Sequence, residues 1–173
     1  MAEVRFAGQS DLASLCGLRR YQDETHRKAA EEEHRRRLAA AHSGAALYVI
    51  IEEVRELIGH VFLKLDGSAT QPGHPVMDDL LVREGDRGRG LGTLLIAECE
   101  RLTREHAFDK LGLAVNPFLN PRAKGLYERL GYCALGERPY LDGVYDGDED
   151  WVIDMVKELL PEAMAGEQPP TIS

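Results

Sequence analysis

Aromatic residues and long apolar runs are both scarce in this chain of 173 residues. Phe, Trp and Tyr make up only 6% of the sequence, so aliphatic side chains must build most of its core. No apolar run approaches the length that crosses a bilayer, and the first residues lack a basic segment followed by an apolar one. We therefore expect a cytoplasmic protein that has no membrane partner.

Cysteine is scarce as well, since the three cysteines are too few and too widely spaced for a disulfide framework. Cys16, Cys99 and Cys133 each lie among apolar residues, and we interpret them as reduced core residues. The sequence contains neither CxxC nor HExxH spacing, and its six histidines are scattered. It therefore predicts no metal site.

Basic residues are outnumbered, with 21 Lys and Arg against 30 Asp and Glu and a formal net charge of −9. This balance disfavours binding to a nucleic-acid backbone, so we predict no nucleic-acid partner, and cationic ligands are the natural complement. An acidic cluster near the C-terminus could increase solubility or recruit a cation, and the sequence does not decide between these two roles. The cluster consists of Asp142, Asp146, Asp148, Glu149 and Asp150.

Histidines recur at intervals of eight residues in the most highly charged stretch, residues 25–42. This stretch predicts a helix with stacked i,i+4 Glu–Arg pairs and a thin apolar stripe. We interpret it as a solvated helix that carries His26, His34 and His42 on its exposed face, with a mobile lid as the alternative. We interpret His60, in a predicted strand, as structural, with a place in the active centre as the alternative.

A short apolar strand, a loop rich in Gly and Arg and the start of a helix follow one another between residues 77 and 95. Residues 87–92 offer backbone N–H groups at a helix N-terminus, whose dipole favours anions, so they predict a diphosphate site. No Gly-Lys-Ser/Thr follows, which excludes a P-loop, and Thr93 stands where a dinucleotide fold needs its third glycine. Taken alone, the loop could also be a simple tight turn.

Runs rich in β-branched and aromatic residues at 46–52 and 57–65 predict an antiparallel hairpin. A crossover helix after the glycine loop leads to a strand at 110–116, which should lie parallel to the strand before that loop. Closing strands are expected at 132–135 and 151–156, with a long loop between them.

Two motifs resemble the GCN5-related N-acetyltransferase (GNAT) family. Arg87-x-x-Gly90-x-Gly92 is similar to the loop that binds the pyrophosphate of acetyl-CoA. Residues 120–132, with Asn120 and Tyr127, resemble the helix that flanks the pantetheine arm and ends in a Gly-aromatic turn. The two motifs are in register, and the resemblance covers about residues 4 to 157.

The resemblance implies an α/β (α+β) fold with one GNAT-type domain at residues 1–160. We expect a mixed central sheet of about six to seven strands, about four flanking helices and splayed parallel central strands. Residues 161–173 are rich in Pro and Gly and predict a disordered tail. Family members are often dimers, so a homodimer is also implied.

The resemblance also implies acetyl-CoA as co-substrate, with no metal. It gives the backbone of residues 80–82 the role of pairing with pantetheine and polarising the acetyl carbonyl. It assigns the diphosphate to the glycine loop and the pantetheine or ribose-phosphate region to Asn120. The expected cofactor-binding residues are Leu80, Leu81, Val82, Arg87, Gly88, Arg89, Gly90, Leu91, Gly92, Thr93, Asn120 and Tyr127.

Acetyl transfer to an amine needs a base, because an alkylamine with a pKa near 10.4 is neutral only about one part in a thousand at pH 7. The candidates are Asp78 and Asp79. Strand alternation places Asp78 on the face of Leu80 and Val82 and Asp79 on the opposite face, so only one can serve. A similarity to diamine acetyltransferases favours Asp78, and the family gives Tyr127 the role of protonating the CoA sulfur.

We therefore predict an N-acetyltransferase that moves acetyl from acetyl-CoA to the primary amine of a small cationic acceptor, such as a polyamine or aminoglycoside, by direct attack in a ternary complex. The alternatives are a peptide or protein N-acetyltransferase and a non-catalytic acyl-CoA-binding module. Ala114 stands where ribosomal-protein alanine acetyltransferases carry a catalytic Glu, which weakens a ribosomal N-terminus as acceptor.

Overall fold

Strands and helices follow the order β1-α1-α2-β2-β3-β4-α3-β5-α4-β6-β7-β8 in a computed structural model that describes residues 1–145 and 147–161. The helices are α1 (Leu12–Cys16), α2 (Glu24–His42), α3 (Leu91–Glu105) and α4 (Pro121–Arg129). The strands are β1 (Glu3–Phe6), β2 (Ala46–Glu53), β3 (Glu56–Lys64), β4 (Val76–Val82), β5 (Lys110–Val115), β6 (Cys133–Ala134), β7 (Tyr140–Tyr145) and β8 (Asp148–Glu158). Of the predicted tail at 161–173, all but Pro161 lie outside the described residues.

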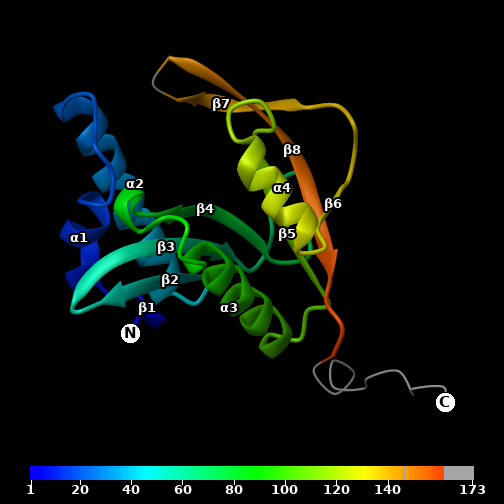
Figure 1. Ribbon diagram of the computed structural model, residues 1–173, viewed down its shortest axis with the longest axis horizontal. Coiled ribbons are helices and arrows are strands. Elements are labelled where there is room, and N and C mark those ends of the chain that lie inside the picture. The colour runs from blue at the N-terminus through cyan, green and yellow to red at the C-terminus, as the bar shows by residue number, and fades with distance from the viewer. Residues whose placement is uncertain (146, 162–173) are drawn as a thin grey trace.

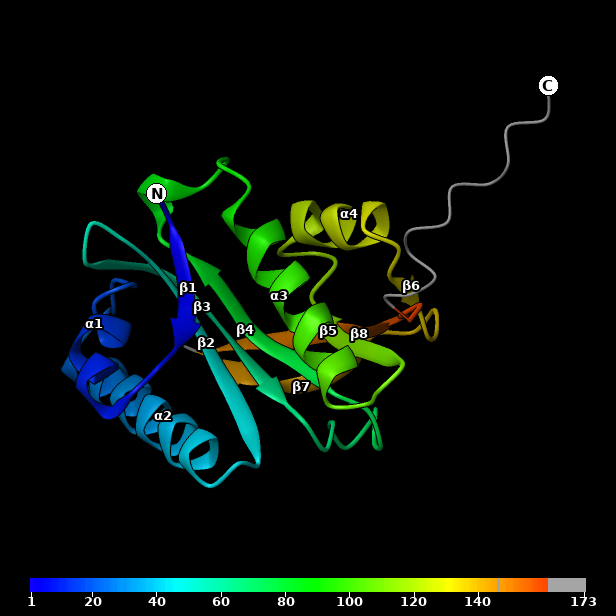
Figure 2. The same cartoon turned by 90° about the horizontal axis from the view of Figure 1, so that it is seen from below.

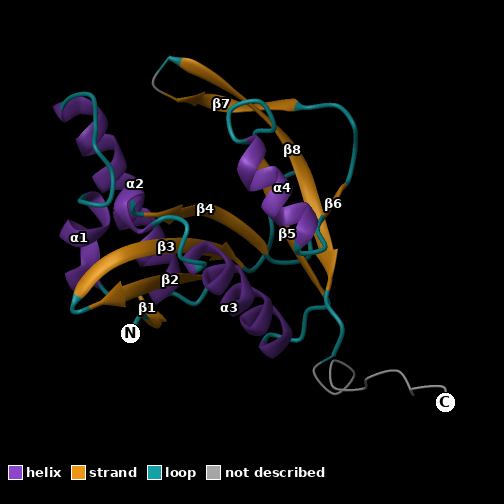
Figure 3. Ribbon diagram, viewed as in Figure 1, coloured by secondary structure: helices purple, strands orange, loops and turns teal. Residues whose placement is uncertain are grey.

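The strands form one mixed sheet in the order β1-β2-β3-β4-β5-β8-β6, with β7 paired to β8 outside this path. Among the strands that the structure describes, β4 and β5 are the one parallel pair, and they are joined by a crossover through α3. They pair at Val76–Gly112 and Met77–Leu113 and then separate, so the two halves of the sheet are splayed (Figure 1; Figure 3). The predicted hairpin of β2 and β3 and the splayed parallel pair are both confirmed.

Helices cover both faces of the sheet (Figure 2). On one face α3 and α4 enclose the α3 core, in which Leu95 and Cys99 pack with Met155 of β8. On the other face α1 and α2 enclose the α2 core, in which Leu38 packs with Tyr48 of β2. The sheet therefore separates two distinct cores, and β4 borders both.

The stretch predicted as a long loop contains a strand, β7, and the first residues of β8. These two strands form an antiparallel hairpin in which Leu141 lies opposite Trp151, with a bulge between Leu141 and Gly143. The bulge and the acidic residues break the alternation of apolar and polar side chains by which a strand is recognised in a sequence. Among residues 1–145 and 147–161 the mixed sheet has eight strands, with β7 added to the about six to seven that were expected, and the α/β fold class is confirmed.

Helix α2 begins as predicted, because Asp23 caps it by accepting a hydrogen bond from the backbone N–H of His26 at 2.9 Å. The interpretation of its histidines as a solvated face is wrong for His34, which is only 5% exposed. Its Nδ1 lies 2.7 Å from the hydroxyl oxygen of Tyr48 on β2. The reason is that the thin stripe formed by His34 and Leu38 is the face that packs on the sheet.

The cysteines differ in burial. Cys99 is a core residue as predicted, whereas Cys16 is half-buried and Cys133 is exposed. Cys133 lies on β6, a strand of two residues at the edge of the sheet, which cannot cover its side chain. None of the helices among residues 1–145 and 147–161 is both long and apolar enough to cross a membrane.

Candidate active site

A cleft of about 1180 Å³ lies along the half of β4 that has no β5 partner. Residues 79–88 and 90–93, which run from β4 into the first turn of α3, form most of its lining. Residues 17–20 of the α1–α2 linker and three residues of α4 and its N-cap complete it. The cleft thus joins the splayed strand to the N-terminus of α3.

The loop that enters α3 has the geometry of an anion site. Gly88 and Gly90 adopt left-handed conformations, with φ of +79° and +78°, that favour glycine. Gly90 is the N-cap of α3, and no side chain among the described residues caps the helix in its place. The N–H groups of the first turn are therefore free to bind an anion, and the residues fit a diphosphate.

Most of the predicted cofactor-binding residues line this cleft together. They are Leu80, Leu81, Val82, Arg87, Gly88, Gly90, Leu91, Gly92, Thr93 and Asn120. Arg87 is held beside the loop because its Nε donates a hydrogen bond to the Val82 carbonyl at 3.2 Å. Asn120 is also the N-cap of α4, since its Oδ1 accepts a hydrogen bond from the Ala123 N–H at 3.2 Å.

Arg89 and Tyr127 are not among the cleft-lining residues. The guanidinium of Arg89 donates to Glu53 at 2.9 Å and to Asp86 at 2.8 Å, so it is already paired within the protein. Tyr127 is 8% exposed and its ring packs edge-on against Tyr132 at 6.0 Å. Burial, followed by the nearby Cys99, raises the pKa of Tyr127 to about 12, so its hydroxyl keeps its proton at neutral pH.

A bulge in β4 overturns the expected alternation of the two aspartates. Asp78 pairs with Phe62 of β3 and Leu81 with His60, which leaves an extra residue between them, and Asp79 adopts a left-handed φ of +50°. Both carboxylates consequently lie beside Arg37 of α2, at 3.8 Å for Asp78 and 2.6 Å for Asp79. The prediction that they occupy opposite faces is wrong, because the bulge turns both toward α2.

The two carboxylates nevertheless have different surroundings. Asp79 is paired with Arg19 and Arg37, whereas Asp78 is more exposed and lies 3.0 Å from Lys64 Nζ. Burial opposes ionisation of Asp79, but His60, Arg19 and Arg37 outweigh it and lower the pKa to about 2. A carboxylate with so low a pKa is a poor proton acceptor, which leaves Asp78 as the better candidate base.

Further carboxylates lie on the β7–β8 hairpin. Asn116, which follows β5, donates a hydrogen bond from Nδ2 to Asp150 Oδ1 at 2.7 Å. Burial raises the pKa of Tyr145, and Asp142, Asp78 and Asp150 raise it further. Tyr145 therefore lies within electrostatic range of both the hairpin carboxylates and Asp78. Asp146 of the predicted acidic cluster lies outside the described residues.

Comparison with protein-family models gives a match over residues 14–132 to the family described as Acetyltransferase (GNAT) family. The chain belongs to the GNAT family. It is thus an acetyltransferase by family, and acetyl-CoA is the co-substrate of that enzyme class. No curated protein matches the sequence significantly.

Solved structures share the fold of this GNAT chain. The protein yncA from Salmonella typhimurium, solved with acetyl-CoA, is 17% identical with a TM-score of 0.70 over 94% of this chain and 96% of that one. A spermidine N-acetyltransferase chimera from Vibrio cholerae and hSSAT is 21% identical, with a TM-score of 0.71 over 91% and 95%. A ribosomal-protein-alanine N-acetyltransferase from Brucella melitensis is 17% identical, with a TM-score of 0.71 over 91% and 99%.

Sequence reasoning missed four basic residues that line the cleft of the acetyltransferase, namely Arg19, Arg20, Arg83 and Arg122. Arg122 could have been found, since it follows the motif residue Asn120 by two positions on the same helix. Arg19 and Arg20 lie in the α1–α2 linker, and nothing in their local sequence shows that it reaches β4.

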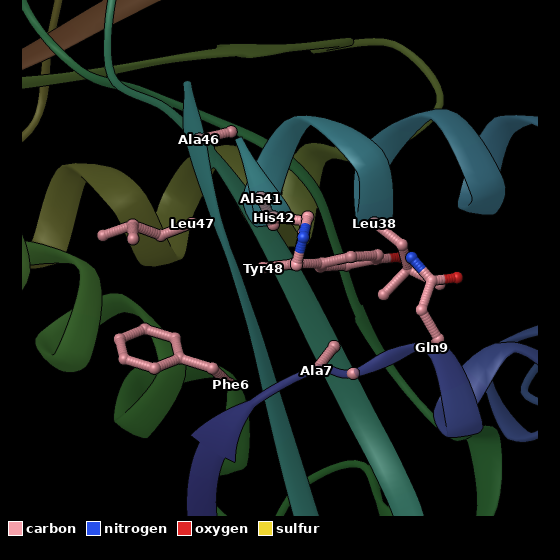
Figure 4. A pocket seen from close by; sticks show the side chains of 10 residues that line it. Phe6, Ala7, Gln9, Leu38, Ala41, His42, Ala46, Leu47 and Tyr48 are labelled. Atoms are coloured by element: carbon pink, nitrogen blue, oxygen red, sulfur yellow. The ribbon is translucent and has the colours of Figure 1, made fainter. Parts of the chain in front are cut away.

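A second cavity, of about 210 Å³, lies where the chain after β1 meets α2 and β2 (Figure 4). Phe6 and Leu47 line one side of it, and His42 and Tyr48 line another. It shares no residue with the cleft and contains none of the predicted site residues. Across the part of the chain that the structure describes, no group of three or more His, Cys, Asp and Glu side chains could hold a metal ion.

Proposed function

We propose that the chain transfers the acetyl group of acetyl-CoA to the primary amine of a small polycationic acceptor, such as a polyamine or aminoglycoside, by direct attack in a ternary complex. The observation that carries the proposal is the arrangement around β4. An uncapped, basic helix N-terminus lies at one end of the cleft, and a half-exposed carboxylate lies at the bulge. We take residues 1–160 as the catalytic domain.

The co-substrate would be held by its phosphates. The N–H groups of Leu91 and Gly92 and the guanidinium of Arg87 are suited to the diphosphate. Arg122, at the start of α4, adds a further positive charge to the same cleft. When bound, acetyl-CoA supplies a thioester whose carbonyl the backbone of the unpaired half of β4 can polarise.

The chain's own acid–base groups would move two protons. Asp78 accepts the proton that the ammonium must lose before it can attack, directly or through a water. Tyr127, with its pKa of about 12, remains protonated and can donate to the departing sulfur. The second role is the smaller one, because a thiol with a pKa near 8.5 is already a competent leaving group.

The acidic β7–β8 hairpin supports a cationic acceptor. Asp142 and Asp150 act on Tyr145 together with Asp78, so a second ammonium of the acceptor would meet negative charge beyond the attacking amine. The spermidine acetyltransferase chimera with the same fold supports this choice of acceptor.

A peptide α-amine is the second candidate acceptor, because Arg20 lines the cleft and makes no ion pair within the described residues. Its guanidinium could bind a peptide carboxylate. Ala114 stands where ribosomal-protein alanine acetyltransferases carry a catalytic Glu, which argues against this candidate. A cytoplasmic location and a homodimer stay predictions from the sequence.

The test is a titration of acetyl-CoA by calorimetry, followed by release of CoA in the presence of spermidine, an aminoglycoside or a peptide with a free α-amine. We expect micromolar binding and release with spermidine or the aminoglycoside well above the rate without acceptor. Release with the peptide alone would favour the second candidate. Binding without release by any acceptor would indicate a non-catalytic acyl-CoA-binding module.

A further inference from the structure

Four charged or polar side chains lie together at the bulge of β4, and the proposed transfer chemistry uses none of them. They are Arg19, Arg37, His60 and Asp79. Arg19 comes from the α1–α2 linker and Arg37 from α2, and both donate hydrogen bonds to the carboxylate of Asp79. His60 of β3 also lies close to this carboxylate, with its Nε2 3.9 Å from Asp79 Oδ2. The linker, the helix and two strands therefore meet at one carboxylate.

At neutral pH the two arginines compensate the charge of Asp79, because His60 is charged only at a pH below its own low pKa. His60 is 1% exposed, and neither of its ring nitrogens has a hydrogen-bond partner within the described residues. Burial lowers the pKa of His60 to about 3, so at neutral pH it is uncharged. Arg37 is itself largely buried, with its guanidinium carbon 5.6 Å from the centre of the Phe62 ring, so it has little freedom to turn away.

The backbone conformation of Asp79 explains why its pairing with the two arginines matters for the bulge. Asp79 has a φ of +50°, a left-handed conformation that non-glycine residues rarely adopt and that persists only where the surroundings hold it. Here the two arginines hold it from one side. On either side of the bulge, Met77 and Leu80 pack in the α3 core, which fixes the strand itself.

We propose that Arg19, Arg37 and Asp79 form a positioning latch, which fixes the bulge of β4 so that Asp78 faces the acceptor while residues 80–82 face the cleft. The kinetic part of this inference rests on the proposed function. In the latch Asp79 is not the base, and Arg37 is a positioning residue that acts through it. Because Arg19 belongs to the linker, the latch also attaches one wall of the cleft to the strand.

The first test measures hydrogen exchange of residues 76–82 and needs no acceptor. In Arg37→Met we expect exchange at least about tenfold faster, because the carboxylate of Asp79 loses the more buried of its two arginine partners and keeps only Arg19. The double variant Arg37→Met/Asp79→Asn should restore part of the protection, since removing both charges costs less than removing one. Arg35→Met is the matched control, because Arg35 lies on the same helix but pairs with Glu31 at the surface.

Equal exchange in Arg37→Met and Arg35→Met would overturn the latch. If Arg37→Met does not fold, Asp79→Asn alone decides, since Asn tolerates a positive φ and keeps the shape of the side chain. We then expect exchange about threefold faster in residues 76–82. Exchange equal to that of the wild type would reject the proposal.

The second test compares pH–rate profiles of Asp79→Asn and the wild type. We expect kcat to fall by about ten- to a hundredfold while the acidic limb remains, because the proposed base Asp78, which lies near Lys64, Arg37 and Tyr145, is still present. Loss of that limb in Asp79→Asn would make Asp79 the base and overturn the latch. If the wild type transfers no acetyl group at all, the proposed function fails, and hydrogen exchange still decides the latch.

Discussion

The two sides of β4 are built in different ways. On the donor side, one continuous segment, residues 80–93, supplies the strand backbone, the loop and the helix N-terminus. On the proposed acceptor side, α2, β3, β4 and the β7–β8 hairpin each contribute a side chain, namely Arg37, Lys64, Asp78 and Tyr145. Local sequence can determine the first side, whereas only the tertiary structure can assemble the second.

The largest effect is expected on the donor side, from Gly90→Pro. Proline requires φ near −65°, whereas Gly90 has φ of +78°, so the N-terminus of α3 cannot keep its shape. We expect acetyl-CoA to bind at least about a hundredfold more weakly, which calorimetry would measure. Gly85→Ala is the control, because a methyl group there meets nothing within 4 Å. Unchanged binding by Gly90→Pro would mean that the loop is only a turn.

The same contrast explains which parts of the site could be predicted from the sequence. Glycine spacing identifies the loop because positive φ at Gly88 and Gly90 is a local requirement. The positions of the splayed strands follow from the crossover through α3. The bulge at Asp79 could not be predicted, because its conformation depends on two arginines that lie 42 and 60 residues away in the chain.

The sequence likewise does not predict which polar side chains are buried or paired. His34 lies among charged residues in the chain, and only the packing of α2 on β2 shows that it is a core residue. Arg89 stands in the middle of the glycine motif, but it is paired with Glu53 and Asp86 and does not line the cleft. In both cases a tertiary ion pair or packing contact decides what the local pattern leaves open.

On the acceptor side, Asp78→Asn should have the largest effect. Without a base, the acceptor must lose its proton to water before it attacks, so we expect kcat to fall by about a hundredfold. The affinity for acetyl-CoA, measured by calorimetry, should change by less than about threefold, because Asp78 is not among the cleft-lining residues. A fall in acetyl-CoA affinity equal to the fall in kcat would mean that the two sides are not separate.

Tyr127→Phe should have a smaller effect, because it removes a proton donor and leaves the ring packing intact. We expect kcat to fall by about ten- to a hundredfold, while the Tm changes little since the ring still packs on Tyr132. Steady-state kinetics and thermal unfolding measure the two quantities. Wild-type kcat would leave Tyr127 as a packing residue only.

The α2 core should also make stability depend on pH. Burial lowers the pKa of His60 to about 3, against about 6.5 in the unfolded chain, so unfolding takes up a proton between these values. The free energy of unfolding is then fully present above about pH 6.5 and falls by up to about 1.4 kcal/mol per unit as the pH decreases. His60→Phe should flatten this dependence in urea unfolding at pH 7 and pH 5. Parallel changes in the two proteins would assign the acid sensitivity to other groups.

The smallest effect is expected from the charges of the β7–β8 hairpin. Asp142→Asn/Asp148→Asn should raise the KM for spermidine by about threefold at low salt and leave the KM for acetyl-CoA unchanged, because exposed charges attract a cation only weakly. The difference should shrink at 0.5 M salt, where the Debye length is short. Glu98→Gln/Glu105→Gln removes the same charge from α3. If both double variants raise the KM for spermidine equally, the net charge of the protein attracts the acceptor and the hairpin has no specific role. The proposed acceptor side would then consist of the bulge of β4 and α2.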